Sequence, residues 1–553
     1  MRRFLPLALG VTLLAAPVAR ATTITIINND GAGEGFNDPT VVAPVGGNPG
    51  TTLGAQRLYV FQYAANLWSA ILPDNVTVQV NAQFNPLTCS ATSGVLGSAG
   101  ATTLFRDFPG VPFAGTWYHV ALANRLTGAD LNPANFDINA QFNSSVGGVA
   151  CLPVGWYLGV DGNEGSQIEL LPVVLHELGH GLGFSSTTDG STGAQVGGLP
   201  GVWDHFLYDD ATQLHWIDET AGQRAASGIG CTNLVWDGPA VSSRAPAVLG
   251  PKPMLRETSP VATEYAVGAA TFGPALGPVG VSGQVVLAQD SFGNPTNGCE
   301  SFLNNLTGKI AFIDRGTCGF TVKVKNAQLA GAIGAIVADT VAGCPPAGMS
   351  GTDATITIPS VRVTLADGLV LRTAIPGGLT ATLIADPARQ AGTDAAGRVL
   401  MYAPNPYQSG SSISHWDTSA EPSLLMEPAI TTGLSSSVDL AKQLFMDMGW
   451  FLNAAGVAPT VNRDVLEPCA PNPVHTSALL AYTLSRDQAV DLRVYDIVGR
   501  EVATLASGGQ VAGRHTVIWN TTDAAGRRLP PGMYRYRLRA GGWSDTHSLV
   551  VVR

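Results

Sequence analysis

Residues 176–184 read His-Glu-Leu-Gly-His-Gly-Leu-Gly-Phe, and this segment determines how the first half of the chain is interpreted. Apolar residues recur here at helical spacing, which predicts a helix that begins near Leu170 and ends at the glycines after His180. At about 100° per residue, His176, Glu177 and His180 project from the opposite face. Core histidines do not fit this placement. A solvated polar face is the remaining alternative, but two histidines and a glutamate are an unusual choice for one, so the segment predicts a metal site. The apolar stripe consists of Leu171, Val174, Leu175, Leu178 and Leu182.

The spacing of these polar residues suits one metal ion. Two imidazoles one helical turn apart can share a Zn²⁺ at about 2.0–2.1 Å, and Glu177 can take a proton from a water that the ion polarises. A zinc hydrolase needs a third protein ligand and an open fourth position. Ser186, three residues past Gly183, is a poor zinc ligand. The candidates for the third ligand are Asp204, His205, His215 and His415.

Length and composition bound the class of protein. At about 100–200 residues per domain, 553 residues predict three or four domains. The 65 glycines and 36 prolines favour turns, short strands and ordered loops. The formal net charge of −11 argues against nucleic acid and anionic membrane surfaces as partners.

The N-terminus is typical of a signal peptide. Arg2 and Arg3 precede an apolar run over residues 4–18, and Ala19-Arg20-Ala21 resembles a cleavage site. We therefore expect residues 1–21 to be removed, with no membrane span afterwards. The predicted location is secreted or on the bacterial cell surface.

The seven cysteines agree with export. None forms a Cys-x-x-Cys pair, so a zinc ribbon or a thioredoxin-type site is unsupported. Proximity favours disulfides between Cys89 and Cys151 and between Cys299 and Cys318. The odd number leaves at least one thiol or an intermolecular bond.

Alternation and periodicity predict the remaining elements. In the first part we expect a strand at 23–27, a helix at 58–71, a strand at 76–84, and a loop-rich region with short strands such as 117–121. Further on, strands at 283–289, 309–314 and 361–364 accompany a helix that runs into a strand over 321–338, a helix from 365 and a last helix near 437–448. Short alternating segments at 478–484, 489–495, 514–519, 533–538 and 548–552 predict a small β-sandwich.

Residues 176–184 also resemble the active-site helix and glycine turn of the metzincin zinc peptidases. Leu425-Met426-Glu427-Pro428 resembles their Met-turn, and the long insertion before the His415-Trp416 pair is similar to the leishmanolysin-like members. The resemblance implies that His415 is the third ligand and that Met426 forms a hydrophobic floor below the metal. No cysteine precedes Cys89, so a cysteine-switch propeptide is not expected.

Two further segments resemble known modules. Lys309-Ile-Ala-Phe-Ile-Asp314-Arg315-Gly-Thr-Cys318 and its continuation to Ala332 resemble a protease-associated (PA) domain. That resemblance implies a module that binds or gates protein substrates without catalytic residues, in which Asp314 and Arg315 form a structural turn. Pro471-Asn-Pro473, Val494-Tyr-Asp496 and Gly532-Met-Tyr534 resemble FlgD-like and type IX secretion sorting domains of immunoglobulin-like fold. They imply contact with secretion machinery or attachment to the cell surface.

The predicted fold is therefore an α+β multidomain chain, in which an α/β PA domain interrupts a metzincin-like catalytic domain and a β-sandwich follows. The predicted parts are the signal peptide 1–21, the catalytic domain 22–255 and 387–451, the PA domain 256–386, the linker 452–467 and the C-terminal domain 468–553.

The predicted function is zinc-dependent cleavage of protein or peptide substrates, with Glu177 as general base. The alternative is a surface binding or adhesion protein with a structural or inactive zinc site. Acidic loops at 161–164 and Asp209-Asp210 are candidate calcium sites.

Overall fold

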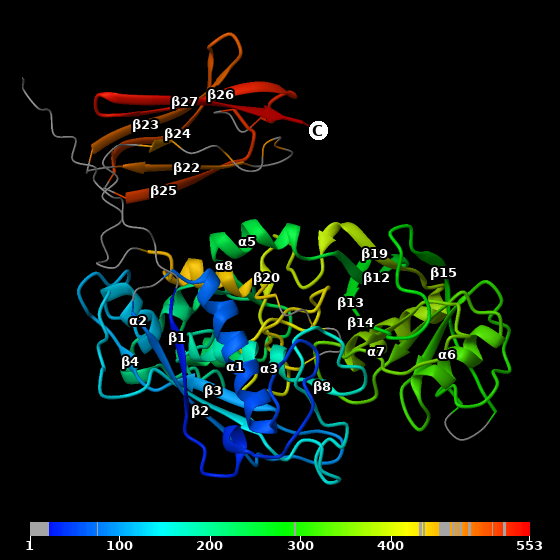
Figure 1. Cartoon of the computed structure of the whole chain (residues 1–553). Coiled ribbons are helices and arrows are strands. Elements are labelled where there is room, and N and C mark those ends of the chain that lie inside the picture. The colour runs from blue at the N-terminus through cyan, green and yellow to red at the C-terminus, as the bar shows by residue number, and fades with distance from the viewer. Residues whose placement is uncertain are drawn as a thin grey trace, which may run out of the picture. The chain divides into compact units, whose positions relative to one another are not determined.

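The computed structural model describes residues 22–73, 76–291, 295–430, 434, 437–452, 465–466, 469, 472, 474, 478–484, 488–510, 513–523 and 527–552. The chain divides into two compact units, residues 1–451 and 452–553 (Figure 1). The predicted signal peptide and most of the predicted linker lie outside the described residues. Among the helices that are described, none is long and apolar enough to cross a bilayer.

The first unit opens with a four-stranded sheet in the order β1-β2-β6-β3. The strands β1, β2 and β6 run parallel, and β3 closes one edge in the antiparallel direction. Along β2 every second residue is buried, which gives the sheet one apolar face. Helices α1 and α3 pack against each other, and α3 lies against β3 and β6 (Figure 1). The bounds are β1 (Ile24–Asn28), α1 (Leu53–Ile71), β2 (Val78–Asn85), β3 (Gly97–Ala101), β6 (Ile138–Asn143) and α3 (Leu170–Gly181).

The strand predicted at 117–121 is only partly correct. The extended backbone covers Tyr118–His119 (β5), and helix α2 (Val120–Thr127) begins immediately afterwards. All but the last residue of α2 are buried, and its first four residues, Val-Ala-Leu-Ala, form a short apolar run that does not distinguish a helix from a strand. The short strands β4 (Leu104–Phe105), β7 (Trp156–Tyr157) and β8 (Ile168–Glu169) complete this region.

A second small sheet follows the order β10-β9-β11-β20. Strand β11 precedes a long insertion, strand β20 follows it, and the two pair antiparallel. The N–H of Ala391 donates to the carbonyl of Gly250 at 2.9 Å, so the two ends of the insertion lie side by side. We call residues 22–250 and 391–451 the host region and residues 251–390 the inserted region. The bounds here are β9 (Leu207–Asp209), β10 (Leu214–His215), α4 (Ala221–Ser227), β11 (Leu234–Trp236), α5 (Pro239–Arg244), β20 (Val399–Leu400) and α8 (Ala441–Met448).

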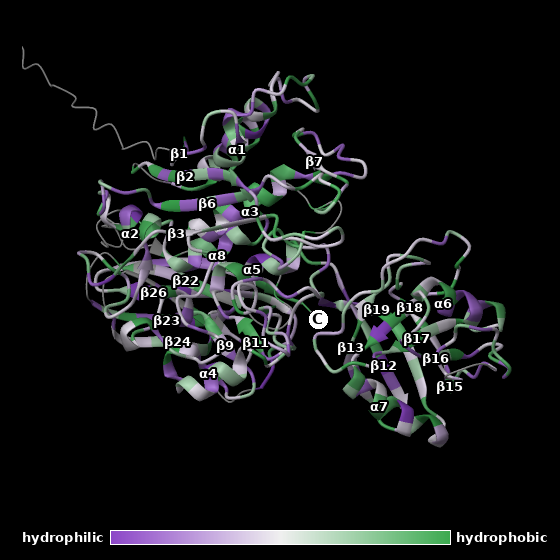
Figure 2. Cartoon of the chain, turned by 90° about the horizontal axis from the view of Figure 1, so that it is seen from below, coloured by the Kyte–Doolittle hydropathy of each residue, from purple (hydrophilic) through white to green (hydrophobic). Residues whose placement is uncertain are grey.

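The inserted region forms an eight-stranded sheet in the order β13-β12-β19-β15-β16-β17-β18-β14. Its central strands β16 and β17 are apolar (Figure 2), and every residue of β17 is buried. Helix α7 packs with Phe312 and Ile336, and α6 packs with Ala311 and Val337 on the opposite face. The bounds are β12 (Pro251–Ser259), β13 (Thr263–Ala266), β14 (Gly268–Ala269), β15 (Val281–Leu287), β16 (Ile310–Asp314), α6 (Phe320–Leu329), β17 (Gly334–Ala338), β18 (Ser360–Val363), α7 (Leu365–Ala374) and β19 (Thr380–Gln390).

The second unit consists of two antiparallel sheets, β21-β22-β25 and β24-β23-β26-β27. Its core gathers alternate residues of facing strands, among them Leu480, Leu492, Tyr536 and Leu549. The bounds are β21 (Val465–Leu466), β22 (Ala478–Leu484), β23 (Gln488–Asp496), β24 (Glu501–Gln510), β25 (Gly513–Trp519), β26 (Gly532–Ala540) and β27 (Trp543–Val551). The predicted α+β multidomain architecture with a β-rich C-terminal part is thus observed.

Candidate metal centre and cleft

Helix α3 presents its histidines as the sequence predicted. Leu171, Val174, Leu175 and Leu178 are buried in the main core of the host region. His176 is 6% exposed, and His180 and Glu177 are partly exposed on the other face. The helix ends at Gly181. Two residues later, Gly183 has a φ of 116°, a value that favours glycine. This turn brings the carbonyl of Phe184 back to accept a hydrogen bond from Nδ1 of His180 at 2.7 Å.

His415 follows the inserted region in the sequence, and its side chain lies beside those of His176 and His180. Its backbone pairs with Tyr402, whose N–H donates to the His415 carbonyl at 2.9 Å. Its Nδ1 faces the carbonyl of Ser411 at 2.7 Å, and Nδ1 of His176 faces the carbonyl of Leu425 at the same distance. A carbonyl can only accept, so all three rings carry their proton on Nδ1.

The three Nε2 atoms therefore face one another as acceptors. They lie 3.0 Å apart for His176 and His180, 3.1 Å for His180 and His415, and 3.2 Å for His415 and His176. Imidazole nitrogens bound to one tetrahedral Zn²⁺ lie about 3.3 Å apart, since each bond is about 2.0–2.1 Å. Three converging lone pairs with no proton between them fit a cation. Within the described part of the chain, this is the one group of three or more His, Cys, Asp or Glu side chains close enough to hold a metal ion.

The electrostatics favour the neutral, metal-binding form of each ring. Burial lowers the pKa of His176 to about 3 and that of His180 to about 4. Burial also holds the pKa of His415 well below its usual value, and the two other histidines lower it further. Neutral imidazole is the form that binds a metal ion.

Met426, which the resemblance predicts to form a hydrophobic floor below the metal, lies against Gly179 of helix α3. It is fully buried, and its carbonyl accepts a hydrogen bond from the N–H of Trp416 at 2.9 Å. Two carboxylates shape the turn: Oε1 of Glu427 accepts from the Leu424 N–H at 2.7 Å, and Oδ2 of Asp439 accepts from the Leu425 N–H. Because the carbonyl of Leu425 orients His176, these carboxylates fix one ring of the centre indirectly.

The other candidate ligands lie elsewhere. The buried carboxylate of Asp204 accepts hydrogen bonds from Thr188, Ser186, Gln195 and Gly201. His205 Nε2 lies 3.0 Å from the Thr116 hydroxyl, and His215 pairs with Asp237. At the candidate calcium loops, the Asp161 carboxylate accepts from Tyr157 and Asp210 pairs with Arg398.

An open cleft of about 940 Å³ runs past the histidines. One wall is the edge strand β3, and the backbone N–H of Ala99 on that strand lies near the Glu177 carboxylate. Burial raises the pKa of Glu177 to about 8. The other acidic residues along the cleft are Glu164, Glu169 and Glu427.

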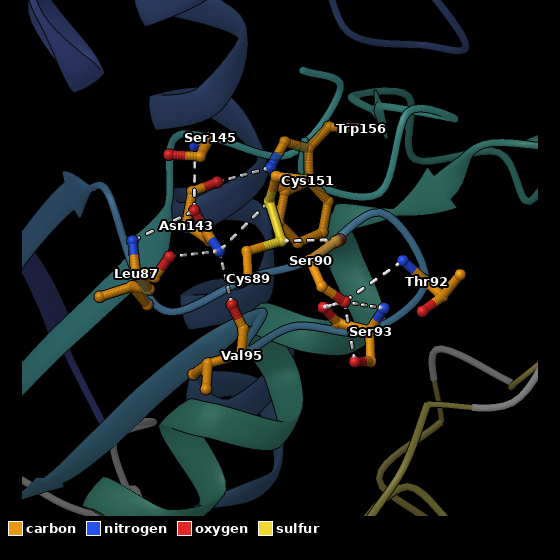
Figure 3. The surroundings of a disulfide bond; sticks show 10 residues. All are labelled: Leu87, Cys89, Ser90, Thr92, Ser93, Val95, Asn143, Ser145, Cys151 and Trp156. Carbon is orange, nitrogen blue, oxygen red and sulfur yellow. Dashed lines mark hydrogen bonds between the residues drawn. A yellow bond between two sulfur atoms is a disulfide. The ribbon is translucent and has the colours of Figure 1, made fainter. Parts of the chain in front are cut away.

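The disulfide between Cys89 and Cys151, expected from proximity, supports another part of the cleft wall (Figure 3). Beside it, the buried side chain of Asn143 accepts from the Leu87 N–H at 3.2 Å and donates to the Val95 carbonyl at 2.8 Å. The segment between these two residues contributes Thr92, Ser93 and Gly94 to the cleft. The Cys89–Cys151 disulfide and the side chain of Asn143 together hold residues 87–95 in place.

The other cysteines give one expected and one unexpected result. Cys299 and Cys318 form the predicted bridge within the inserted region. Cys231 of the host region bonds Cys344 of the inserted region, 113 residues away, a pair that proximity in sequence could not predict. Cys469 is a buried free thiol. The sequence also gave no signal for Ala99, because a main-chain N–H carries no residue preference, nor for Asp439, which acts on backbone alone.

Comparison with known proteins identifies two modules. Residues 281–371 match the family model for the PA domain, and residues 475–542 match that for the FlgD Ig-like domain. The chain contains a PA domain and a FlgD-like immunoglobulin domain. The PA domain lies in the inserted region, and the FlgD-like domain lies in the second unit.

The similarity to each of the following proteins covers only part of this chain. The minor extracellular protease Vpr of Bacillus subtilis is 37% identical over 78 residues, 14% of this chain and 9% of that protein. This chain thus spans about a tenth of that relative. Among solved structures, an aminopeptidase from Aneurinibacillus sp. strain AM-1 is 24% identical, with 25% of this chain and 31% of that one covered and a TM-score of 0.20. Latent PorU from Porphyromonas gingivalis is also 24% identical, with 16% and 9% covered and a TM-score of 0.15.

Proposed function

We propose that this chain is a secreted zinc endopeptidase with a metzincin-like catalytic domain, formed by the host region, residues 22–250 and 391–451, since residues 251–255 and 387–390 of the predicted domain belong to strands of the inserted sheet. The observation that carries the proposal is the convergence of three neutral Nε2 atoms, from His176, His180 and His415, within 3.2 Å of one another. Such a set holds Zn²⁺ and leaves a fourth position for a reactant. The cleft beside the three rings gives a substrate access to that position.

Glu177 is placed to move protons. Its carboxylate lines the cleft next to His176 and His180, with the Ala99 N–H nearby. A bound Zn²⁺ would acidify a water molecule and polarise the scissile carbonyl. Glu177 would take the proton of that water and later donate it to the leaving amine.

The cleft suits an extended polypeptide. Strand β3 is the last strand of its sheet, so one of its edges is unpaired by the other strands. Main-chain groups of an edge strand can bind a peptide as an additional strand. Residues 96–99 line the cleft, so a bound peptide would pass the histidines along its length, which favours cleavage within a chain.

The alternative, a binding protein with a structural zinc site, requires a fourth protein ligand that closes the site. Among the described residues the cluster holds three imidazoles and opens onto the cleft. In the proposed peptidase, the PA domain would bind or gate protein substrates, and the FlgD-like domain would serve sorting or surface attachment. Export rests on the predicted signal peptide.

Purified mature protein, assayed on denatured casein beside Glu177→Gln, tests the proposal. We expect wild-type activity, a loss of more than about 100-fold in the variant, and equal zinc content, since general-base catalysis contributes about 10²–10⁴-fold. Glu300→Gln, at an exposed position of the inserted region, is the matched control and keeps full activity. Zinc-loaded protein that cleaves no substrate, with no inhibitory segment, would favour the binding protein.

A further inference from the structure

The bridge between Cys231 and Cys344 joins the host region to the inserted region beside the segment that carries His415. The N–H of Cys231 donates to the Ala403 carbonyl at 2.8 Å. Cys344 and Asn405 exchange backbone hydrogen bonds of 3.2 and 3.1 Å. The two half-cystines therefore flank residues 403–405: Cys231 is hydrogen-bonded to Ala403, and Cys344 is hydrogen-bonded to Asn405.

Residues 403–405 lead directly to the metal centre. Just before them, Tyr402 pairs with both Ile413 and His415 through backbone hydrogen bonds of 2.7 and 2.9 Å. Just after Asn405, the chain forms the loop 406–412, which lines the cleft with Ser409, Gly410 and Ser411. The Ser411 carbonyl accepts from Nδ1 of His415 at 2.7 Å and so sets the direction of Nε2.

The far end of this loop has its own anchors in the host region. The indole N–H of Trp203 donates to the Ile413 carbonyl at 3.2 Å, and the Ser186 N–H donates to the Ser414 hydroxyl at 3.1 Å. The near end, at Asn405, bonds the backbone of Cys344, which belongs to the inserted region. The disulfide is the covalent link that keeps Cys344 in contact with the host region at this point.

We propose that Cys231 and Cys344 are positioning residues for His415, and that their bridge makes the inserted PA-containing region a structural support of the third metal ligand. This inference rests on the proposed zinc centre. Without the bridge, the near end of the loop 406–412 loosens, the Ser411 carbonyl no longer holds His415 in one orientation, and the site loses preorganisation. Residues that orient a metal's ligands typically change its affinity by about 10–100-fold.

The test uses the full chain with Cys231→Ser and Cys344→Ser combined. Zinc affinity is measured by competition with a chromophoric chelator, and the visible spectrum of the Co²⁺-substituted protein reports the coordination. We expect zinc affinity to fall about ten-fold, with a changed Co²⁺ spectrum. Cys299→Ser with Cys318→Ser removes the bridge that lies wholly within the inserted region and is the matched control, with unchanged affinity and spectrum.

The outcomes separate this inference from the proposed function. Wild-type protein that binds no zinc overturns the proposed function, whereas equal affinity in wild type and the Cys231/Cys344 variant overturns the positioning role alone. A bridge that only stabilises the fold would lower the Tm of zinc-free and zinc-loaded protein equally, but a positioning bridge also shrinks the zinc-induced rise in Tm. If the serine variant does not fold, Cys231→Val with Cys344→Ala replaces it. Failure of both to fold would assign the bridge to overall stability and overturn the proposal.

Discussion

Gly179 of helix α3 lies directly against the thioether of Met426. A β-carbon on Gly179 would come within 2.8 Å of Sδ and within 3.1 Å of Cε of Met426, with the ring of Trp68 at 3.4 Å. The glycine between the two helical histidines therefore lets helix α3 pack closely against Met426.

Gly179→Ala is expected to destabilise the protein although alanine favours helices. The helix gains about 1 kcal/mol in propensity, but overpacking a filled core costs about 1–3 kcal/mol, because Met426 and Trp68 are both fully buried. We expect the Tm of the metal-free protein to fall by about 1–2 °C, because a net loss of about 1 kcal/mol is divided by the unfolding entropy of the large first unit. Gly222→Ala in α4, where a β-carbon meets no atom within 4 Å, should leave the Tm unchanged or raise it. A Gly179→Ala variant as stable as wild type would contradict the close contact.

His415→Ala should weaken zinc binding more than about 100-fold, beyond the range for residues that only orient ligands. Chelator competition measures the affinity. His215→Ala is the control, because His215 pairs with Asp237 away from the cluster, and it should bind zinc as wild type does. Unchanged affinity in His415→Ala would show that His415 is not the third ligand.

Glu219 should make stability depend on pH. Its Oε1 accepts from the Thr212 hydroxyl at 2.6 Å, its Oε2 is buried without a partner among the described residues, and burial with the nearby Asp209 raises its pKa to about 7. The folded chain thus keeps a proton that the unfolded chain releases near pH 4.5. Stability is full below that pH and falls as pH rises through about 7, by about 3 kcal/mol at most.

Glu219→Gln tests this dependence in metal-free protein, since glutamine stays neutral at every pH. We expect the variant to melt at a higher temperature than wild type at pH 8 and at a similar temperature at pH 5. An equal difference in Tm at both pH values would show that Glu219 is already ionised in the folded chain at pH 5.

Asn143→Ala should loosen the cleft wall beside Cys89. The change leaves the Leu87 N–H and the Val95 carbonyl without their partner, which costs about 1–3 kcal/mol. Hydrogen exchange should become faster in residues 87–95, and KM for peptides should rise more than kcat falls. Asn139→Ala on the same strand removes only an exposed bond to Asn81 and should change neither. Slow exchange in Asn143→Ala would show that the disulfide alone holds the segment.

Local patterns predicted the elements whose chemistry is local. The face of α3 that carries His176 and His180 follows from helical period, and the strands of the C-terminal unit follow from alternation. Strand β6 lies in a region expected to be mostly loop, since its exposed residues are Asn and Gln, which are uncommon in strands.

Relationships between distant residues could not be read from spacing. From residue types alone, His415 was no better a candidate for the third ligand than Asp204, His205 or His215. Only the resemblance to a family distinguished it. Cys231 and Cys344 are likewise brought together by the insertion point, where Gly250 and Ala391 are hydrogen-bonded. Pairings of this kind depend on tertiary contacts that no sequence window contains.

The insertion also orders events during synthesis. His415 leaves the ribosome 235 residues after His180, so the whole inserted region is translated before the third imidazole becomes available. Until then the nascent chain offers only the two imidazoles of its helix, whereas a catalytic zinc site has three protein ligands. The position of the module thus delays the assembly of the proposed metal centre until about three quarters of the chain has been translated.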